Sequence, residues 1–135
     1  MFTKLANPST FQKLSDFIYP KCFFLFVIFL FSGFYYAFFS SPPDYLQGET
    51  VRIMYIHVPS AWLSLMIYSS MGICSIISLI WKHTLADIIS RSCAPIGASF
   101  TLVTLITGSI WGKPTWGTWW VWDARLKSVL ILFFL

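Results

Sequence analysis

The chain has 135 residues, of which 57% are hydrophobic and only 10% are charged. Soluble proteins carry about 25% charged residues, so this composition excludes a water-covered globular domain and indicates a membrane protein. The net charge is +4, but the basic residues are scattered singly, which excludes the basic stripe of a nucleic-acid-binding protein.

The first uncharged apolar run covers residues 22–40, CFFLFVIFLFSGFYYAFFS. A helix of this length crosses about 30 Å of hydrocarbon. A cleaved signal peptide is the alternative, but its apolar region would be shorter, about 7–15 residues. We therefore favour a retained first span.

The second and third apolar segments are separated by a short polar connection, residues 82–92. We expect the helix of the second span to begin near Pro59, because the residue before a proline resists the α conformation. The second span is then 59–81, and residues 52–58 form a lead-in at the membrane surface. The third span, 93–110, is uncharged and rich in Gly, Ser, Thr and Ala, which suit close helix packing in a membrane.

The last apolar segment, 126–135, is too short to cross a bilayer as a helix. We therefore expect an all-α fold, a polytopic transmembrane helix bundle with three complete spans and the start of a fourth. The whole of 1–135 is predicted to be a single membrane domain and a fragment of a longer bundle. The cysteines form no CxxC motif, so we interpret them as small apolar helix residues, Cys22, Cys74 and Cys93.

Orientation follows from the basic residues near the ends of the spans. The N-terminal segment carries three lysines, Lys4, Lys13 and Lys21, and is predicted to be cytoplasmic. The loop 41–52 is then outside, the connection 82–92 inside, and the segment 111–125 outside. The third span is expected to lie antiparallel to the second because the connection between them is short.

Segment 111–126 reads WGKPTWGTWWVWDARL and holds five of the seven tryptophans. The predicted orientation brings it to the same outer face as His57. His83 lies about 39 Å further along the helix, at a rise of 1.5 Å per residue, on the opposite side. An imidazole and a cluster of indoles are therefore expected to share one surface.

Haem would suit that surface, since indole faces stack on its macrocycle and imidazole is an axial ligand of its iron. Cations on the same side could meet its propionates, namely Arg52, Lys113 and Arg125. Asp123 could orient a ring nitrogen or cap the helix that follows it. Plainer interpretations also exist, since tryptophans form interfacial belts, as we expect of Trp62 and Trp81. A lone histidine at a span end can be merely interfacial, and the cations can be headgroup anchors.

The segment WGKPTWGTWWVWDARL resembles the tryptophan-rich WWD signature of the haem-handling family of cytochrome c maturation, and most of all its CcmC group. The segment RIMYIHVPSAW resembles the stretch that carries an external haem-ligand histidine in that family, here His57. The resemblance covers the chain from its N-terminal segment to Leu135. The haem-binding residues that it implies are Trp111, Trp116, Trp119, Trp120, Trp122 and Asp123, with His57 as the axial ligand of the iron.

The resemblance further implies a six-helix protein of the bacterial inner membrane, or of the mitochondrial inner membrane. Its expected role is to hold haem at the external face and deliver it to the haem chaperone CcmE. The implied partners are the small subunit CcmD and the transporter subunits CcmA and CcmB, and no covalent catalysis is expected. The sequence departs from the family pattern at two points. The family's second external histidine lies in a later loop, beyond these 135 residues. Lys127 stands where an uncharged residue is expected, at the mouth of the fourth span, and its charge can snorkel to the interface.

Three other functions are compatible with the composition. A permease subunit would need polar residues inside its spans, and these spans contain no charged residue. A structural subunit would use its tryptophans only as interfacial anchors. A larger member of the same family, acting in haem ligation, would have many more spans.

Overall fold

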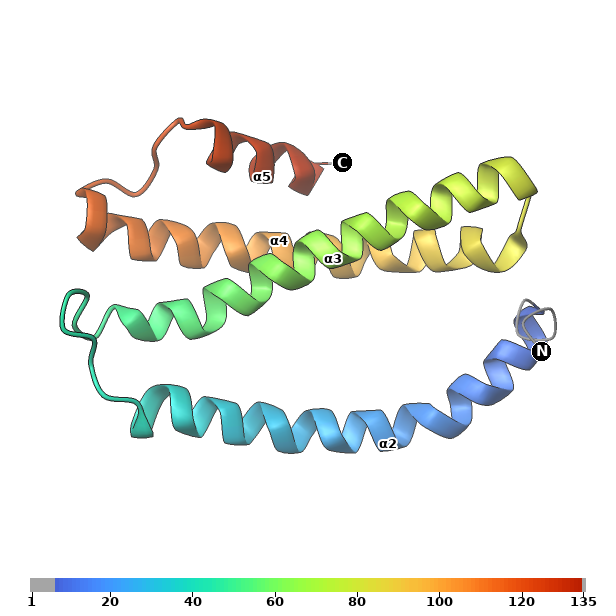
Figure 1. The fold of residues 1–135 in the computed structure, drawn as a ribbon, viewed down its shortest axis with the longest axis horizontal. Coiled ribbons are helices and arrows are strands. Elements are labelled where there is room, and N and C mark those ends of the chain that lie inside the picture. The colour runs from blue at the N-terminus through green and yellow to red at the C-terminus, as the bar shows by residue number, and fades with distance from the viewer. Residues whose placement is uncertain (1–6, 135) are drawn as a thin grey trace.

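Four helices make up the computed structural model, which describes residues 7–134 (Figure 1). They are α2 (Pro8–Tyr35), α3 (Val51–Trp81), α4 (Thr84–Trp116) and the short α5 (Ala124–Phe134). The three long helices are long and apolar enough to cross a membrane. The predicted all-α fold, with three spans and a shorter fourth helix, is confirmed. Lys4 and Leu135 lie outside the described residues.

Helix α2 begins at an Asn-Pro-Ser sequence. Asn7 caps it by accepting a hydrogen bond from the backbone N–H of Ser9 at 3.0 Å, and Pro8 takes a place in the first turn. Pro20 removes a donor from the helix interior, and the ribbon of α2 curves in its N-terminal half (Figure 1). The helix continues into a π-helical turn, η1 (Tyr36–Ser40). The predicted first span, 22–40, therefore lies within α2 and η1.

Helices α3 and α4 form an antiparallel hairpin with a connection of only two residues (Figure 1). Lys82 turns the chain with a positive φ of 49°, and the His83 side chain accepts a hydrogen bond from the N–H of Ala86 at 3.3 Å. The expected polar connection 82–92 was therefore wrong in its extent. Asp87 and Arg91 pair at 2.9 Å across one helical turn, so these charges belong to the first turns of α4.

The expected start of the second span helix at Pro59 was also wrong. Helix α3 begins at Val51 and contains Pro59 in its interior. Holding the residue before Pro59 in the helical conformation, against its preference for an extended backbone, has a modest local cost. An unpaired backbone segment at the membrane would cost more, because each unsatisfied group costs several kcal/mol in hydrocarbon.

Small and hydroxyl-bearing residues form the seam between α3 and α4. The hydroxyls of Ser64 and Thr101 are 2.6 Å apart and buried, and those of Ser75 and Ser90 are 2.8 Å apart. Gly97 lies under the Tyr68 ring, where an added Cβ would meet the ring at 3.1 Å. Lipid tails are as apolar as the helix surfaces, so the hydrophobic effect does not drive the helices together. Close packing and hydrogen bonds hold them together instead.

Candidate functional site

The side chain of His57 connects α3 to α4. Its Nδ1 is 3.0 Å from the Thr107 hydroxyl oxygen, and its ring lies against Gly108, where an added Cβ would come within 3.0 Å of Cε1. The imidazole remains partly exposed. Trp111 lies about 4.5 Å beyond Gly108 along the helix, a little less than one turn. The structure thus brings His57 to the end of α4 at which the tryptophans begin.

The tryptophan segment is not wholly a loop, contrary to the predicted boundaries of 111–125. Helix α4 continues through Trp116 and ends at Gly117, which has a positive φ of 77° that favours glycine. The Trp116 ring packs on the helix at Gly112, where a Cβ would lie 3.3 Å from it. Trp111 meets Trp116 edge to face, with ring centroids 5.3 Å apart. The Gly117 N–H donates to the Lys113 carbonyl at 3.0 Å and so satisfies a carbonyl of the last helical turn.

Residues 117–123 form the loop proper and carry the other three tryptophans. Trp119 and Trp122 are exposed, whereas Trp120 is partly buried and meets Trp122 at 5.6 Å between centroids. The indole N–H of Trp120 is buried and has no hydrogen-bond partner among the described residues. The loop therefore presents the indole faces of Trp119 and Trp122 at the surface.

Two of the three predicted propionate partners lie at this loop. Lys113 donates to the Gly117 carbonyl at 3.1 Å, and its Nζ is 5.9 Å from the Trp119 ring centroid. Arg125 pairs with Asp123 at 3.2 Å and lies 5.5 Å from the Trp116 ring centroid. Arg125, Asp123, Trp116 and Val121 line a hollow of about 300 Å³. Both cations are exposed, and both keep N–H groups free for an anion.

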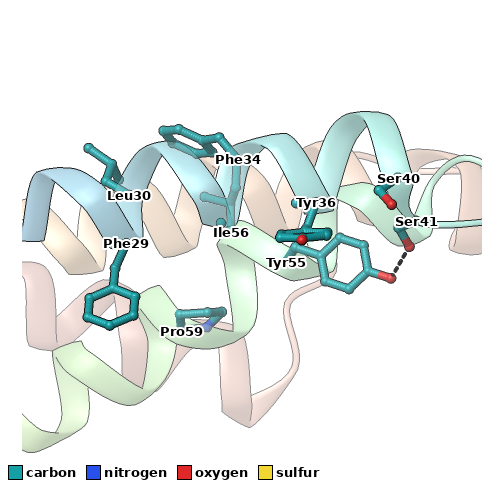
Figure 2. Close-up of a pocket in the computed structure, with 11 residues that line it drawn as sticks. Phe29, Leu30, Phe34, Tyr36, Ser40, Ser41, Tyr55, Ile56 and Pro59 are labelled. Atoms are coloured by element: carbon teal, nitrogen blue, oxygen red, sulfur yellow. Dashed lines mark hydrogen bonds between the residues drawn. The ribbon is translucent and has the colours of Figure 1, made fainter.

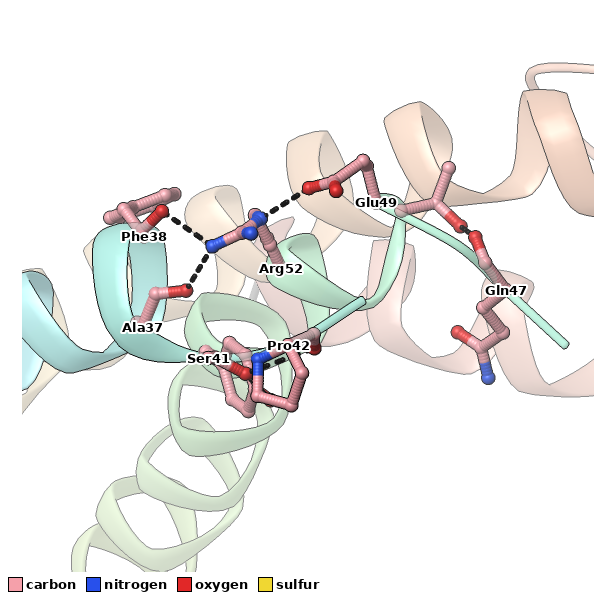
Figure 3. Close-up of polar contacts among 9 residues, drawn as sticks. Ala37, Phe38, Ser41, Pro42, Gln47, Glu49 and Arg52 are labelled. Carbon is pink, nitrogen blue, oxygen red and sulfur yellow. Dashed lines mark hydrogen bonds and ion pairs between the residues drawn. The ribbon is translucent and has the colours of Figure 1, made fainter. Parts of the chain in front are cut away.

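The third, Arg52, is already engaged in the structure. Its guanidinium donates to the carbonyls of Ala37 and Phe38 and to the Glu49 carboxylate (Figure 3). Its side chain is only 21% exposed. Arg52 therefore caps the C-terminal end of the first span and links it to the start of α3.

Asp123 caps α5, one of the two roles considered for it. Its carboxylate accepts the Leu126 N–H at 2.7 Å, and its carbonyl accepts the Lys127 N–H at 3.1 Å. The Leu126 hydrogen bond, and after it the Arg125 guanidinium, hold the pKa of Asp123 below its ordinary value of 3.8. The carboxylate is thus charged at neutral pH, where it also complements the helix N-terminus.

Replacing Asp123 with alanine is expected to fray the first turn of α5, since the Leu126 N–H loses its acceptor. Amide hydrogen exchange at residues 124–127 should accelerate, whereas Asp123→Asn keeps a capping oxygen and should change it little. Because the folded pKa is depressed, the cap's stabilisation exists above the unfolded value of 3.8 and is lost as pH falls through the folded pKa. Unchanged exchange in the alanine variant would contradict the capping role.

Sequence reasoning missed three residues of the site. Gln47 accepts a hydrogen bond from the Trp111 indole N–H at 3.1 Å, which joins the loop before α3 to the tryptophan segment. Thr107 and Gly108 hold the His57 ring. The contact between His57 and Gly108 could have been read from the sequence. His57 precedes the two-residue turn by as many residues as Gly108 follows it. Residues equally far from a tight turn lie at the same depth in an antiparallel hairpin.

A separate apolar groove lies between α2 and α3, with a volume of about 670 Å³ (Figure 2). The Ser41 and Tyr55 hydroxyls are 2.6 Å apart at one end of it. Its other lining residues are mainly aromatic and aliphatic, including Phe29, Phe34 and Pro59. None of the predicted site residues lines this groove.

The chemistry of the tryptophan end suits a flat, aromatic, anionic ligand that also takes a nitrogen ligand. Exposed indole faces, two cations and one imidazole lie at the same end of the α3–α4 hairpin. Within residues 7–134 no group of three or more His, Cys, Asp or Glu side chains could hold a bare metal ion.

Comparison with known proteins gives a match over the whole chain. The family model described as heme exporter protein C, CcmC, matches residues 1–135. A heme exporter protein C of Bradyrhizobium diazoefficiens is 52% identical over 129 residues, which cover 96% of this chain and 49% of that protein. The heme exporter protein C of Escherichia coli K12 is 46% identical over 132 residues, covering 98% of this chain and 54% of that protein.

A relative from an organelle is almost equally similar. A protein of Marchantia polymorpha, described as a ccmC-like mitochondrial protein of cytochrome c biosynthesis, is 50% identical over 139 residues. That alignment covers 100% of this chain and 59% of the relative. The chain thus spans about half the length of the curated relatives that it matches.

Proposed function

The chain belongs to the heme exporter protein C (CcmC) family, and on that premise we propose that it binds haem at the external face of the membrane and passes it on for c-type cytochrome biogenesis. The family is one of heme-handling membrane proteins rather than of enzymes, as expected. It includes both bacterial and mitochondrial relatives. Haem is in this view a transient cargo, and the role of the chain is to hold it.

One observation carries the proposal, the meeting of His57 with α4 one turn before the tryptophan segment. The imidazole contacts Gly108, and Trp111 begins the aromatic cluster on the next turn. His57 would supply a nitrogen to the iron, and the exposed indoles of Trp119 and Trp122 would pack on the macrocycle. Lys113 and Arg125 would meet the propionates.

The rest of the proposal follows from the family. We infer an inner-membrane location, with the N-terminus on the cytoplasmic side and the tryptophan segment on the external side. Delivery would be to a haem chaperone, CcmE, with the small subunit CcmD and the transporter subunits CcmA and CcmB as partners. Asp123 and Trp116 would shape the binding surface from the end of α4 and the start of α5.

Haem titration of the chain in lipid nanodiscs tests the proposal. Binding should give a Soret band and should quench tryptophan emission, since five of the seven tryptophans lie in the segment 111–122. Replacing both Trp119 and Trp122 with phenylalanine should raise the haem Kd about tenfold, because the smaller rings cover less of the macrocycle.

The matched control replaces Trp62 and Trp81, two exposed tryptophans of α3, with phenylalanine. This variant should bind haem as the parent does. If the parent gives no Soret band, or if both double variants weaken binding equally, the proposed site is wrong.

A further inference from the structure

We propose that Thr107 is a positioning residue that fixes the His57 imidazole as its Nδ1–H tautomer and leaves Nε2 as the nitrogen offered to a ligand. The Thr107 hydroxyl oxygen is 2.7 Å from the Val103 carbonyl and 3.0 Å from His57 Nδ1. A hydroxyl has one proton to donate, and a carbonyl can only accept. The Thr107 proton is therefore directed to Val103, and the His57 Nδ1–H donates to the Thr107 oxygen.

The backbone of α4 fixes the position of the ring as well as its protonation. Gly108 offers a flat surface on which Cε1 and Nδ1 of the imidazole lie, and an added Cβ would approach these atoms at 3.0 and 3.6 Å. The threonine in turn is held by its bond to Val103, one turn earlier in the same helix. The ring is thus held by its hydrogen bond to Thr107 and by contact with a helix surface that glycine leaves open.

This arrangement is the one that a metal-binding imidazole needs. Such a histidine binds through one neutral ring nitrogen and donates the N–H of the other to a protein acceptor, which sets its tautomer and orientation. The inference about iron rests on the proposed function, whereas the tautomer of His57 does not. The two can therefore be tested separately.

The chain contains its own control for the tautomer. His83 accepts the Ala86 N–H with its Nδ1 at 3.3 Å, which requires a bare Nδ1 and a proton on Nε2. The two histidines of the chain should therefore show opposite tautomers in the same sample.

Nitrogen-15 NMR of the haem-free chain, with labelled histidine in liposomes, shows which ring nitrogen of each histidine carries the proton. We expect a protonated Nδ1 for His57 and a protonated Nε2 for His83. In Thr107→Val, which keeps the side-chain shape but removes the acceptor, His57 should shift towards the Nε2–H form while His83 stays unchanged. Thr107→Ser keeps the hydroxyl and should behave as the parent. A protonated Nε2 on His57 in the parent, or no change in the valine variant, would overturn the proposal.

Haem titration then tests the consequence for binding. Loss of a hydrogen-bond partner behind a metal-binding histidine weakens metal binding about 10–100-fold, so Thr107→Val should raise the haem Kd by that factor. Thr107→Ser should restore the parent value. Equal affinity in the valine variant, despite a changed tautomer, would refute the positioning role. Failure of the parent to bind haem would refute the proposed function and leave the tautomer result standing.

Discussion

Replacement of His57 with alanine is expected to remove the iron-ligand signature of bound haem and to raise the haem Kd at least about 100-fold. Loss of the hydrogen-bond partner of a metal-binding histidine lowers metal affinity about 10–100-fold, and loss of the histidine itself should lower it at least as much. The indole surface remains in this variant, so residual haem should bind with a shifted and broadened Soret band. Added imidazole should restore the parent spectrum, since it can occupy the space beside Gly108 that the side chain leaves.

His83→Ala is the matched control, because His83 caps α4 at the opposite end of the hairpin. It should leave the haem spectrum and affinity unchanged. If the two alanine variants have the same spectrum, or if imidazole fails to rescue His57→Ala, His57 is not the axial ligand.

A leucine in place of Gly97 is expected to have the largest effect on folding. An added Cβ at 97 would lie 3.1 Å from the Tyr68 ring and 3.2 Å from Cγ2 of Ile67, and a whole isobutyl group must force α3 away from α4. Overpacking of this kind costs about 1–3 kcal/mol of unfolding free energy. Because Gly97 and Gly108 lie on the same seam, separation of the helices should also weaken haem binding.

Unfolding by sodium dodecyl sulfate in mixed micelles, followed by circular dichroism, measures this loss. Gly72→Leu provides the control within the hairpin, since an added Cβ there meets nothing within 4 Å. Its unfolding free energy should stay within about 0.5 kcal/mol of the parent. Equal stability of the two leucine variants would show that the seam at Gly97 is not closely packed.

The number of spans could be predicted because the thickness of the bilayer sets how long an apolar run must be to cross it. The pairing of the second and third spans could be predicted because a short connection forces neighbouring helices to lie antiparallel. The register of the hairpin was also accessible in principle. Ser64 and Thr101 stand at equal sequence separations on either side of the turn at Lys82 and His83, and their hydroxyls share a hydrogen bond. Once the turn is placed at these two residues, equal separation from it identifies the contacts along the seam.

The ends of the helices could not be read in the same way. An apolar run shows which residues are expected to face hydrocarbon, whereas a helix ends where its backbone hydrogen bonds end. Helix α3 therefore begins two turns before Pro59, at Val51, and α4 runs through Pro114 to Trp116. Proline was overvalued as a boundary at Pro59, because membrane helices tolerate it.

Part of the candidate site was accessible from residue types, and part was not. Topology predicted that His57 and the tryptophans would share one end of the hairpin, and the contact with Gly108 fits that expectation. The engagement of Arg52 could not be predicted, since it depends on carbonyls freed where η1 ends. The haem-binding roles of the tryptophans and of Asp123 stay predictions.

The polar seam has a consequence for the biogenesis of this protein. Each long helix satisfies its backbone within itself, so α3 can be threaded into the bilayer before α4 has left the ribosome. A nascent chain at that stage carries His57 without Thr107, Gly108 or any of the five clustered tryptophans. The proposed haem surface would be complete only when α4 docks laterally against α3. A half-made chain would thus lack the proposed surface.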